Sequence, residues 1–167
     1  NLWFGEKDRK SDVLQVWFPG MHSDVGGGYA PKDSRLALVA FTWMLGEALE
    51  AGLHVDPARS RDQLRARSKQ GPDPTAPILP VMTRPWRLAE WLPLLVWDRR
   101  SGNRAWRWSR GRPRSRPLEP VGQETRVKLH RSVQRRLDEC PDYRPCNLPA
   151  LERCDLIDDS PLLDGYR

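Results

Sequence analysis

The chain has 167 residues, which is long enough for one domain with a hydrophobic core. Its 38% hydrophobic and 30% charged residues exclude a chain that is disordered throughout, although they are polar for a globular domain. It contains no apolar run of about 18 residues, so no transmembrane helix is predicted. The net charge of +6 favours anionic partners, namely phospholipid surfaces, nucleic acids or phosphorylated substrates.

A short apolar run over residues 13–18 predicts a buried strand. Only Gln15 interrupts the run, and Pro19 and Gly20 end it. Such a run suits a strand that is covered on both faces, as in a parallel sheet. Residues 21–29, MHSDVGGGY, follow; their three successive glycines predict a shaped loop rather than a helix or strand.

A buried helix is predicted over residues 34–51. Asp33 is the expected N-cap, and Gly52 stands where a C-terminal glycine belongs. Apolar residues occupy two neighbouring faces, so the helix should pack against a sheet. Strand, loop and helix in this order form the basic unit of an α/β fold.

The rest of the chain is predicted to be an irregular, Pro/Arg-rich α+β extension. Its expected elements are a short helix near 60–69, a helix within 86–97 broken at Pro93, a hairpin over 95–108, and a segment over 127–137 that starts extended and becomes helical. In that last segment Ser132 is the expected cap, and Arg135 and Arg136 are expected on the exposed side. The predicted division is 1–55, 56–150 and a mobile acidic tail over 151–167.

His22 is the candidate catalytic residue. It follows the carboxyl end of the predicted strand, where ligands bind in open α/β sheets, and an imidazole that titrates near neutrality suits a general base. Asp24 could orient an imidazole or bind a cation. Backbone N–H groups of Gly26, Gly27 and Gly28 could form an oxyanion hole. The alternative is a hydrogen-bonded structural histidine beside glycines that permit a close helix–strand crossing.

Two stretches, VWFPGMHSDVGGGY (16–29) and LALVAFTWMLGEALEAGL (36–53), together resemble the catalytic-domain family of type VI secretion phospholipase effectors. This family is also found as uncharacterised α/β-hydrolase-like proteins in bacteria and fungi. The resemblance is strong over residues 13–53, weaker over 84–98, and moderate over 127–149, where LHRSVQRRL and YRPCNLP occur.

The resemblance implies the C-terminal part of an α/β-hydrolase-like fold, with a late strand, a histidine loop and a packed helix. It implies a serine lipase or esterase that acts on lipid or phospholipid, with no cofactor or metal and with a secretion-machinery partner. The family's order is serine, aspartate, histidine; His22 matches that histidine, which takes the proton of the serine and passes it to the leaving group. Asp24 matches an aspartate of the loop and receives a supporting role. The implied location is the bacterial cytoplasm before delivery to a target periplasm or membrane.

The sequence departs from the family pattern at the nucleophile. It contains no G-x-S-x-G, it lacks the upstream acid segment, and Ser23 adjoins His22 without a nucleophile elbow. The chain also begins with Asn1 rather than Met. Since loss of a triad member costs orders of magnitude in rate, we expect a C-terminal fragment that is nearly inactive alone.

A basic stretch rich in tryptophan offers an alternative function without catalysis. Its candidate binding residues are Arg99, Arg100, Arg104, Arg107, Trp106 and Trp108. Arginine with aromatic residues suits single-stranded nucleic acid, an anionic membrane surface, or merely a solvated hairpin. The membrane is favoured over nucleic acid because it agrees with a lipase. Of the other histidines, His130 is the second candidate for the catalytic residue, although a capping or packing role explains it, and His54 is expected on the surface.

Overall fold

The computed structural model describes residues 14–67, 69–79, 92–98, 102–108, 118 and 126–165. The chain forms two compact units, one from residues 1–79 and 118–167 and the other from residues 80–117. Half of the predicted helix over 86–97, residues 86–91, lies outside the described residues. From Leu94 onward that segment is a strand, so the prediction of a helix is wrong there.

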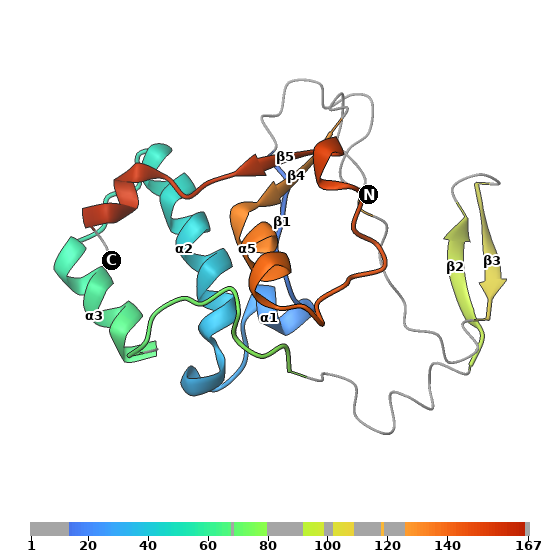
Figure 1. The fold of residues 1–167 in the computed structure, drawn as a ribbon, viewed down its shortest axis with the longest axis horizontal. Helices are drawn as coiled ribbons and strands as arrows, with labels where there is room; N and C mark the ends of the chain where they lie inside the picture. The colour runs from blue at the N-terminus through green and yellow to red at the C-terminus, as the bar shows by residue number, and fades with distance from the viewer. Residues whose placement is uncertain are drawn as a thin grey trace. The chain divides into compact units, whose positions relative to one another are not determined.

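A three-stranded parallel sheet forms the centre of the first unit (Figure 1). Its strands are β1 (Val16–Trp17), β4 (Val127–His130) and β5 (Cys154–Ile157), in the order β1-β4-β5. Trp17 pairs with Leu129, which in turn pairs with Leu156. Leu129 is completely buried in a cluster with Val127, Val133 and Cys154. The predicted parallel pairing is therefore confirmed, and with it the broader prediction of an α/β arrangement. The strand covers only Val16–Trp17 of the predicted residues 13–18, and both residues are half-buried rather than covered on both faces.

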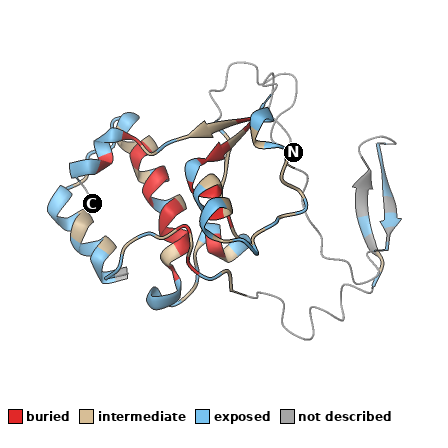
Figure 2. Ribbon diagram, in the orientation of Figure 1, coloured by how far each residue is buried: buried red, intermediate tan, exposed pale blue. Residues whose placement is uncertain are grey.

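Helix α2 (Arg35–Glu50) packs its buried residues against the rest of this unit, as the red stripe in Figure 2 shows. The predicted bounds differ by one residue at each end. The N-cap is Ser34 rather than Asp33, and the Ser34 hydroxyl donates to the carbonyls of Tyr29 and Ala30. Gly52 adopts a φ of 91° just beyond the helix, as expected of a C-terminal glycine.

The acidic segment predicted as a mobile tail is instead an ordered part of the first unit. It contains η3 (Leu151–Arg153), β5 and η4 (Pro161–Gly165). A Cβ on Gly46 of α2 would lie 2.9 Å from Ser160 Cβ, so only glycine permits this close approach. Asp155 pairs with Arg126, and Asp158 pairs with Arg131. The prediction failed because the partners of these carboxylates lie more than twenty residues upstream.

The predicted change from extended to helical structure near residue 131 is confirmed. Helix α5 (Arg131–Glu139) directly follows β4. The short helix predicted near 60–69 corresponds to α3, which begins three residues earlier and ends two residues earlier (Pro57–Arg67). The cap of α5 is His130 rather than Ser132, because the His130 ring accepts the Ser132 backbone N–H. None of the described helices combines the length and apolarity that crossing a membrane requires.

Arg136 is buried, contrary to the prediction that it lies on the exposed side of its helix. Its guanidinium donates to the carbonyls of Pro74 and Ala76 at 2.6 and 2.8 Å and lies 5.0 Å from the centre of the Tyr143 ring. Arg135 is exposed as predicted and pairs with Glu139. The prediction was wrong because the carbonyls of Pro74 and Ala76, in an irregular segment, need a hydrogen-bond donor. Helical periodicity alone does not reveal that need.

The second unit contains the predicted hairpin, formed by β2 (Leu94–Asp98) and β3 (Asn103–Arg107). The strands are antiparallel, with Leu95 opposite Trp106. Gly102 has a φ of 66° in the connecting turn. The turn chemistry of the sequence therefore predicted this hairpin correctly.

We predict that Arg136→Ala lowers the free energy of unfolding by about 2–4 kcal/mol, because it leaves the Pro74 and Ala76 carbonyls without their donor. Arg135→Ala is the matched control and should leave stability nearly unchanged, since its ion pair is exposed. Urea unfolding followed by circular dichroism measures both. Equal stability of the two variants would contradict the assignment of Arg136 as a buried donor.

Candidate active site

His22 begins a single helical turn, α1 (His22–Gly26), shortly after the carboxyl end of β1. The prediction of a loop throughout residues 21–29 is thus wrong for these five residues, which form the helical turn. The His22 side chain is exposed. Strands β1 and β4 are parallel, so their carboxyl ends meet at one edge of the sheet, and α1 follows directly from that edge.

Asp24 is buried, with 2% of its surface exposed, and it shapes this turn. Its carboxylate accepts the backbone N–H of Met21 at 2.8 Å. A Cβ on Gly20 would lie only 2.5 Å from Asp24 Cβ, so a glycine with a φ of 114° lets the two backbone segments approach. Within the described residues no hydrogen bond joins Asp24 to His22. The structure therefore places Asp24 as a cap of α1.

The three glycines leave the helical turn and enter an extended loop. Gly26 ends α1, whereas Gly27 and Gly28 have φ values of 80° and 110°. The Gly27 N–H donates to the Ser23 carbonyl at 3.0 Å, so it is already used. The Gly28 N–H has no hydrogen-bond partner in the described part of the chain. Of these two predicted oxyanion donors, Gly28 is therefore the one with an unused N–H.

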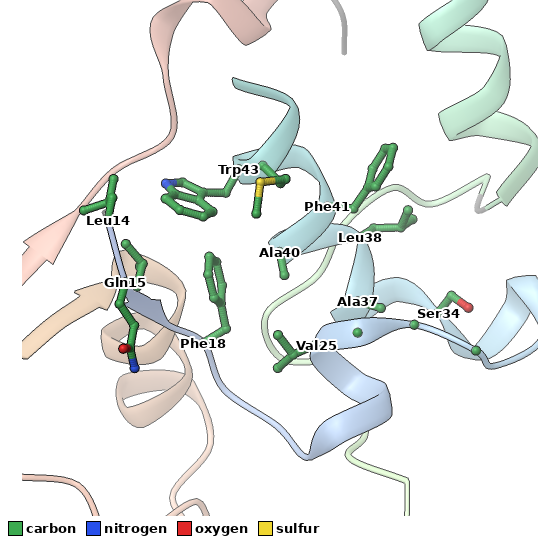
Figure 3. A pocket seen from close by; sticks show the side chains of 15 residues that line it. Leu14, Gln15, Phe18, Val25, Ser34, Ala37, Leu38, Ala40, Phe41 and Trp43 are labelled. Atoms are coloured by element: carbon green, nitrogen blue, oxygen red, sulfur yellow. The ribbon is translucent and has the colours of Figure 1, made fainter. Parts of the chain in front are cut away.

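A largely apolar pocket of about 620 Å³ adjoins these glycines. Figure 3 shows Phe18, which follows β1, and Val25 of α1 facing the same space as Ala40 and Trp43 of α2. Other lining residues include Leu14, Gln15, Leu38, Phe41 and Met44. Phe41 and Met44 remain 51% and 59% exposed. Helical periodicity predicts that such apolar residues of α2 pack inside the protein, and only their clustering in space indicates a binding surface.

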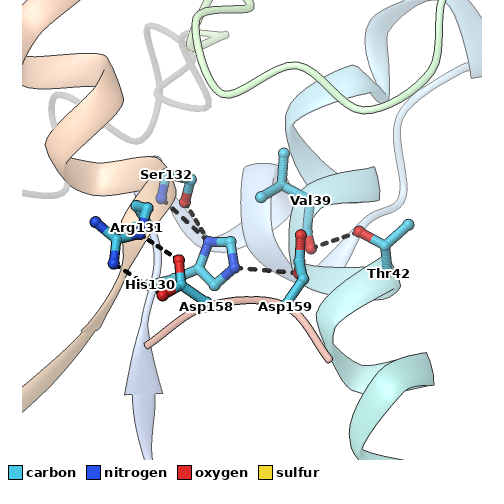
Figure 4. A network of polar contacts seen from close by, with 7 residues as sticks. All are labelled: Val39, Thr42, His130, Arg131, Ser132, Asp158 and Asp159. Atoms are coloured by element: carbon cyan, nitrogen blue, oxygen red, sulfur yellow. Dashed lines mark hydrogen bonds and ion pairs between the residues drawn. The ribbon is translucent and has the colours of Figure 1, made fainter. Parts of the chain in front are cut away.

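His130 ends β4 at the same sheet edge and is enclosed by polar partners (Figure 4). Its Nδ1 accepts the Ser132 N–H at 3.2 Å and lies 2.8 Å from Ser132 Oγ. Its Nε2 lies 3.2 Å from Asp159 Oδ1. With 4% of its surface exposed and both ring nitrogens engaged, His130 fits the capping and packing role expected from the sequence.

The basic candidates belong to the second unit. Arg104, Trp106 and Trp108 are exposed, whereas Arg99 and Arg100 lie outside the described residues. Arg107 ends β3. His54 is exposed, as predicted. No three His, Cys, Asp or Glu side chains gather as metal ligands within the described ranges.

We predict that Asp24→Ala lowers the free energy of unfolding by about 1–2 kcal/mol, because the Met21 N–H loses its acceptor. Asp24→Asn retains an acceptor oxygen and should keep most of the stability. Asp33→Ala, a change at the incorrectly predicted cap, is the control and should have little effect. Thermal and urea unfolding test this order; equal losses for Ala and Asn would contradict the capping role.

Comparisons with known proteins agree with the resemblance found in the sequence. Residues 2–47 match the family model described as "T6SS, Phospholipase effector Tle1-like, catalytic domain". The chain is 41% identical over 54 residues to "Uncharacterized protein YEL023C" of Saccharomyces cerevisiae, a match that covers 30% of this chain and 8% of the yeast protein. No solved structure matches the chain. The predicted resemblance to the type VI secretion phospholipase effector catalytic domain is thus confirmed, and the matched residues include β1, His22, the three glycines and most of α2.

Proposed function

We propose that this chain supplies the histidine-bearing part of an α/β-hydrolase-type serine lipase or esterase that hydrolyses ester bonds in lipids, with phospholipids as the favoured substrates. One observation carries the proposal: an exposed histidine begins α1 beyond a parallel strand, inside the segment that matches a phospholipase effector family. A solvent-accessible imidazole at this edge suits proton transfer.

In this proposal His22 is the general base that takes the proton of a serine hydroxyl and returns it to the leaving alcohol. No G-x-S-x-G occurs in the 167 residues, so the serine is expected from additional sequence or a second polypeptide. The acid that orients His22 is expected there too, because the Asp24 carboxylate is buried on the Met21 N–H. Asp24 therefore supports the site by shaping α1.

The pocket beside the glycines is the proposed seat of an acyl chain. Its volume falls within the range of about 300–1,000 Å³ typical of small-molecule sites, and apolar side chains dominate its lining. Gly28 lies on its wall, and its backbone N–H, which donates to none of the described residues, can donate to an oxyanion. In this proposal the pocket binds the apolar acyl chain, and the adjacent Gly28 N–H stabilises the negative charge that develops on the ester oxygen.

We predict that His22→Ala, made in the longest natural polypeptide that contains this sequence, lowers kcat/KM for phospholipid and short-chain esters by about 10³-fold or more. His54→Ala is the control and should retain full activity. The 167-residue chain alone should hydrolyse these esters near the background rate. Full activity of His22→Ala would refute the proposed function.

A second proposed function, contact with an anionic membrane surface, rests on the hairpin of the second unit. Leu95 and Trp106 are cross-strand partners and are 46% and 68% exposed; Trp108 is 64% exposed, and Arg104 is exposed as well. Tryptophan lies favourably at the headgroup level, where arginine meets anionic lipid. This surface suits either attachment of a lipase to its substrate or binding without catalysis.

We predict salt-sensitive cosedimentation of the chain with vesicles of phosphatidylserine and phosphatidylcholine, and weak cosedimentation with phosphatidylcholine alone. The double variant Arg104→Ser/Trp106→Ser should lose most of the binding, whereas Arg59→Ser/Arg61→Ser on α3 should retain it. Equal binding by both double variants would exclude the hairpin as the contact. Tighter binding to single-stranded RNA than to the anionic vesicles would favour nucleic acid instead.

A further inference from the structure

We infer that His130, held by Asp159, is a positioning residue for the turn that carries His22. The inference rests on the proposed function, since it assigns to a segment beyond the family match a role in orienting the catalytic histidine. Three contacts carry it, namely His130 with Asp159, His130 with Phe18, and Phe18 with Trp43.

The first step is the fixed orientation of the His130 ring. The backbone N–H of Ser132 can only donate, so Nδ1 must accept and the ring proton lies on Nε2. That N–H faces Asp159 Oδ1 at 3.2 Å (Figure 4). Two hydrogen bonds on opposite sides of the ring therefore fix its plane. They also leave neither nitrogen free to accept a proton from a substrate.

The second step is the contact between this ring and Phe18. The two rings are stacked, with centroids 4.8 Å apart and planes 25° apart. On α2, the Trp43 ring lies 5.5 Å from the same phenyl ring at 57°. Phe18 thus contacts both the end of β4 and the apolar side of α2. A ring with contacts from two elements has little freedom to move.

The third step is the short connection from Phe18 to His22. Pro19 is fully buried and has a restricted φ, and Gly20 packs directly against Asp24. The Asp24 carboxylate then binds the Met21 N–H, next to His22. Between Phe18 and His22, every residue therefore either has a restricted backbone or makes a close contact with Asp24. A displacement of Phe18 would therefore be passed to the first turn of α1 instead of being absorbed by a flexible loop.

A matched pair of neighbouring aspartates separates positioning from general stability. Asp159 faces buried His130, whereas Asp158 pairs with exposed Arg131. The hydrogen bond from Arg131 lowers the pKa of the Asp158 carboxyl. Both positions lie between β5 and η4, so substitutions there disturb the same backbone segment. Asp158 also acts on His130 through its charge, whereas Asp159 accepts a hydrogen bond from its ring, so a difference between the two variants would reflect that hydrogen bond.

The test uses the imidazole NMR signals of the chain's three histidines. In Asp159→Ala, the His22 signals should shift and broaden while those of His54, an internal reference, stay unchanged. Asp158→Ala should leave the His22 signals as in the wild type, and Asp159→Asn, which keeps an acceptor oxygen, should restore them. If Asp159→Ala does not fold, Phe18→Leu replaces it, because this variant keeps the His130–Asp159 bond but removes the stacked ring.

In the longest natural polypeptide, Asp159→Ala should lower kcat about 10- to 100-fold with little change in KM, as expected for a misplaced catalytic group. Asp158→Ala should keep kcat. The inference is overturned if Asp159→Ala and Phe18→Leu change the unfolding midpoint but leave both the His22 signals and kcat equal to those of Asp158→Ala. Activity that survives His22→Ala refutes the proposed function instead, so the two failures are distinguishable.

Discussion

The parallel pairing of β1 with β4 is the contact on which the rest of the first unit depends. It joins Trp17 to Leu129, residues more than a hundred positions apart, across the whole second unit and its flanking segments. Because the strands are parallel, both carboxyl ends point to one edge, and the His22 turn and His130 follow from that edge. Without this pairing, Phe18 and His130 would not stack, and the polar contacts around His130 would lie apart from the glycine segment.

Local patterns in the sequence predicted the elements whose determinants are local. The apolar run before Pro19, the apolar residues followed by Gly52, and the turn residues around Gly102 each specify a strand, helix or hairpin within a few residues. The structure confirms all three. The exception is α1, since one helical turn capped by the acid at Asp24 has too few residues to show a periodicity. The three glycines that end it led to the prediction of a loop over the whole segment 21–29.

Contacts between distant residues were beyond sequence reasoning. The burial of Arg136 depends on carbonyls about sixty residues upstream. The acidic segment is held in place by ion pairs with Arg126 and Arg131 and by the pairing of β5 with β4. Charge density suggested mobility because an acidic run without its partners is well solvated. Likewise, the position of His22 was readable from its motif, whereas the pocket formed by Phe18, Val25 and α2 emerges only from packing. The site is therefore partly local in origin and partly a product of the whole fold.

The order β1-β4-β5 also has a consequence for how the sheet could grow. Within the described residues β1 is paired along one side only, and the other two strands of this sheet, β4 and β5, lie on that side. Along its other side β1 has no paired strand in the described part of the chain, and the backbone groups of such an edge can pair with another extended segment. Strand addition at this border would lengthen the sheet without rearranging it. Evolution could in this way attach or detach neighbouring strands while the histidine turn keeps its local geometry.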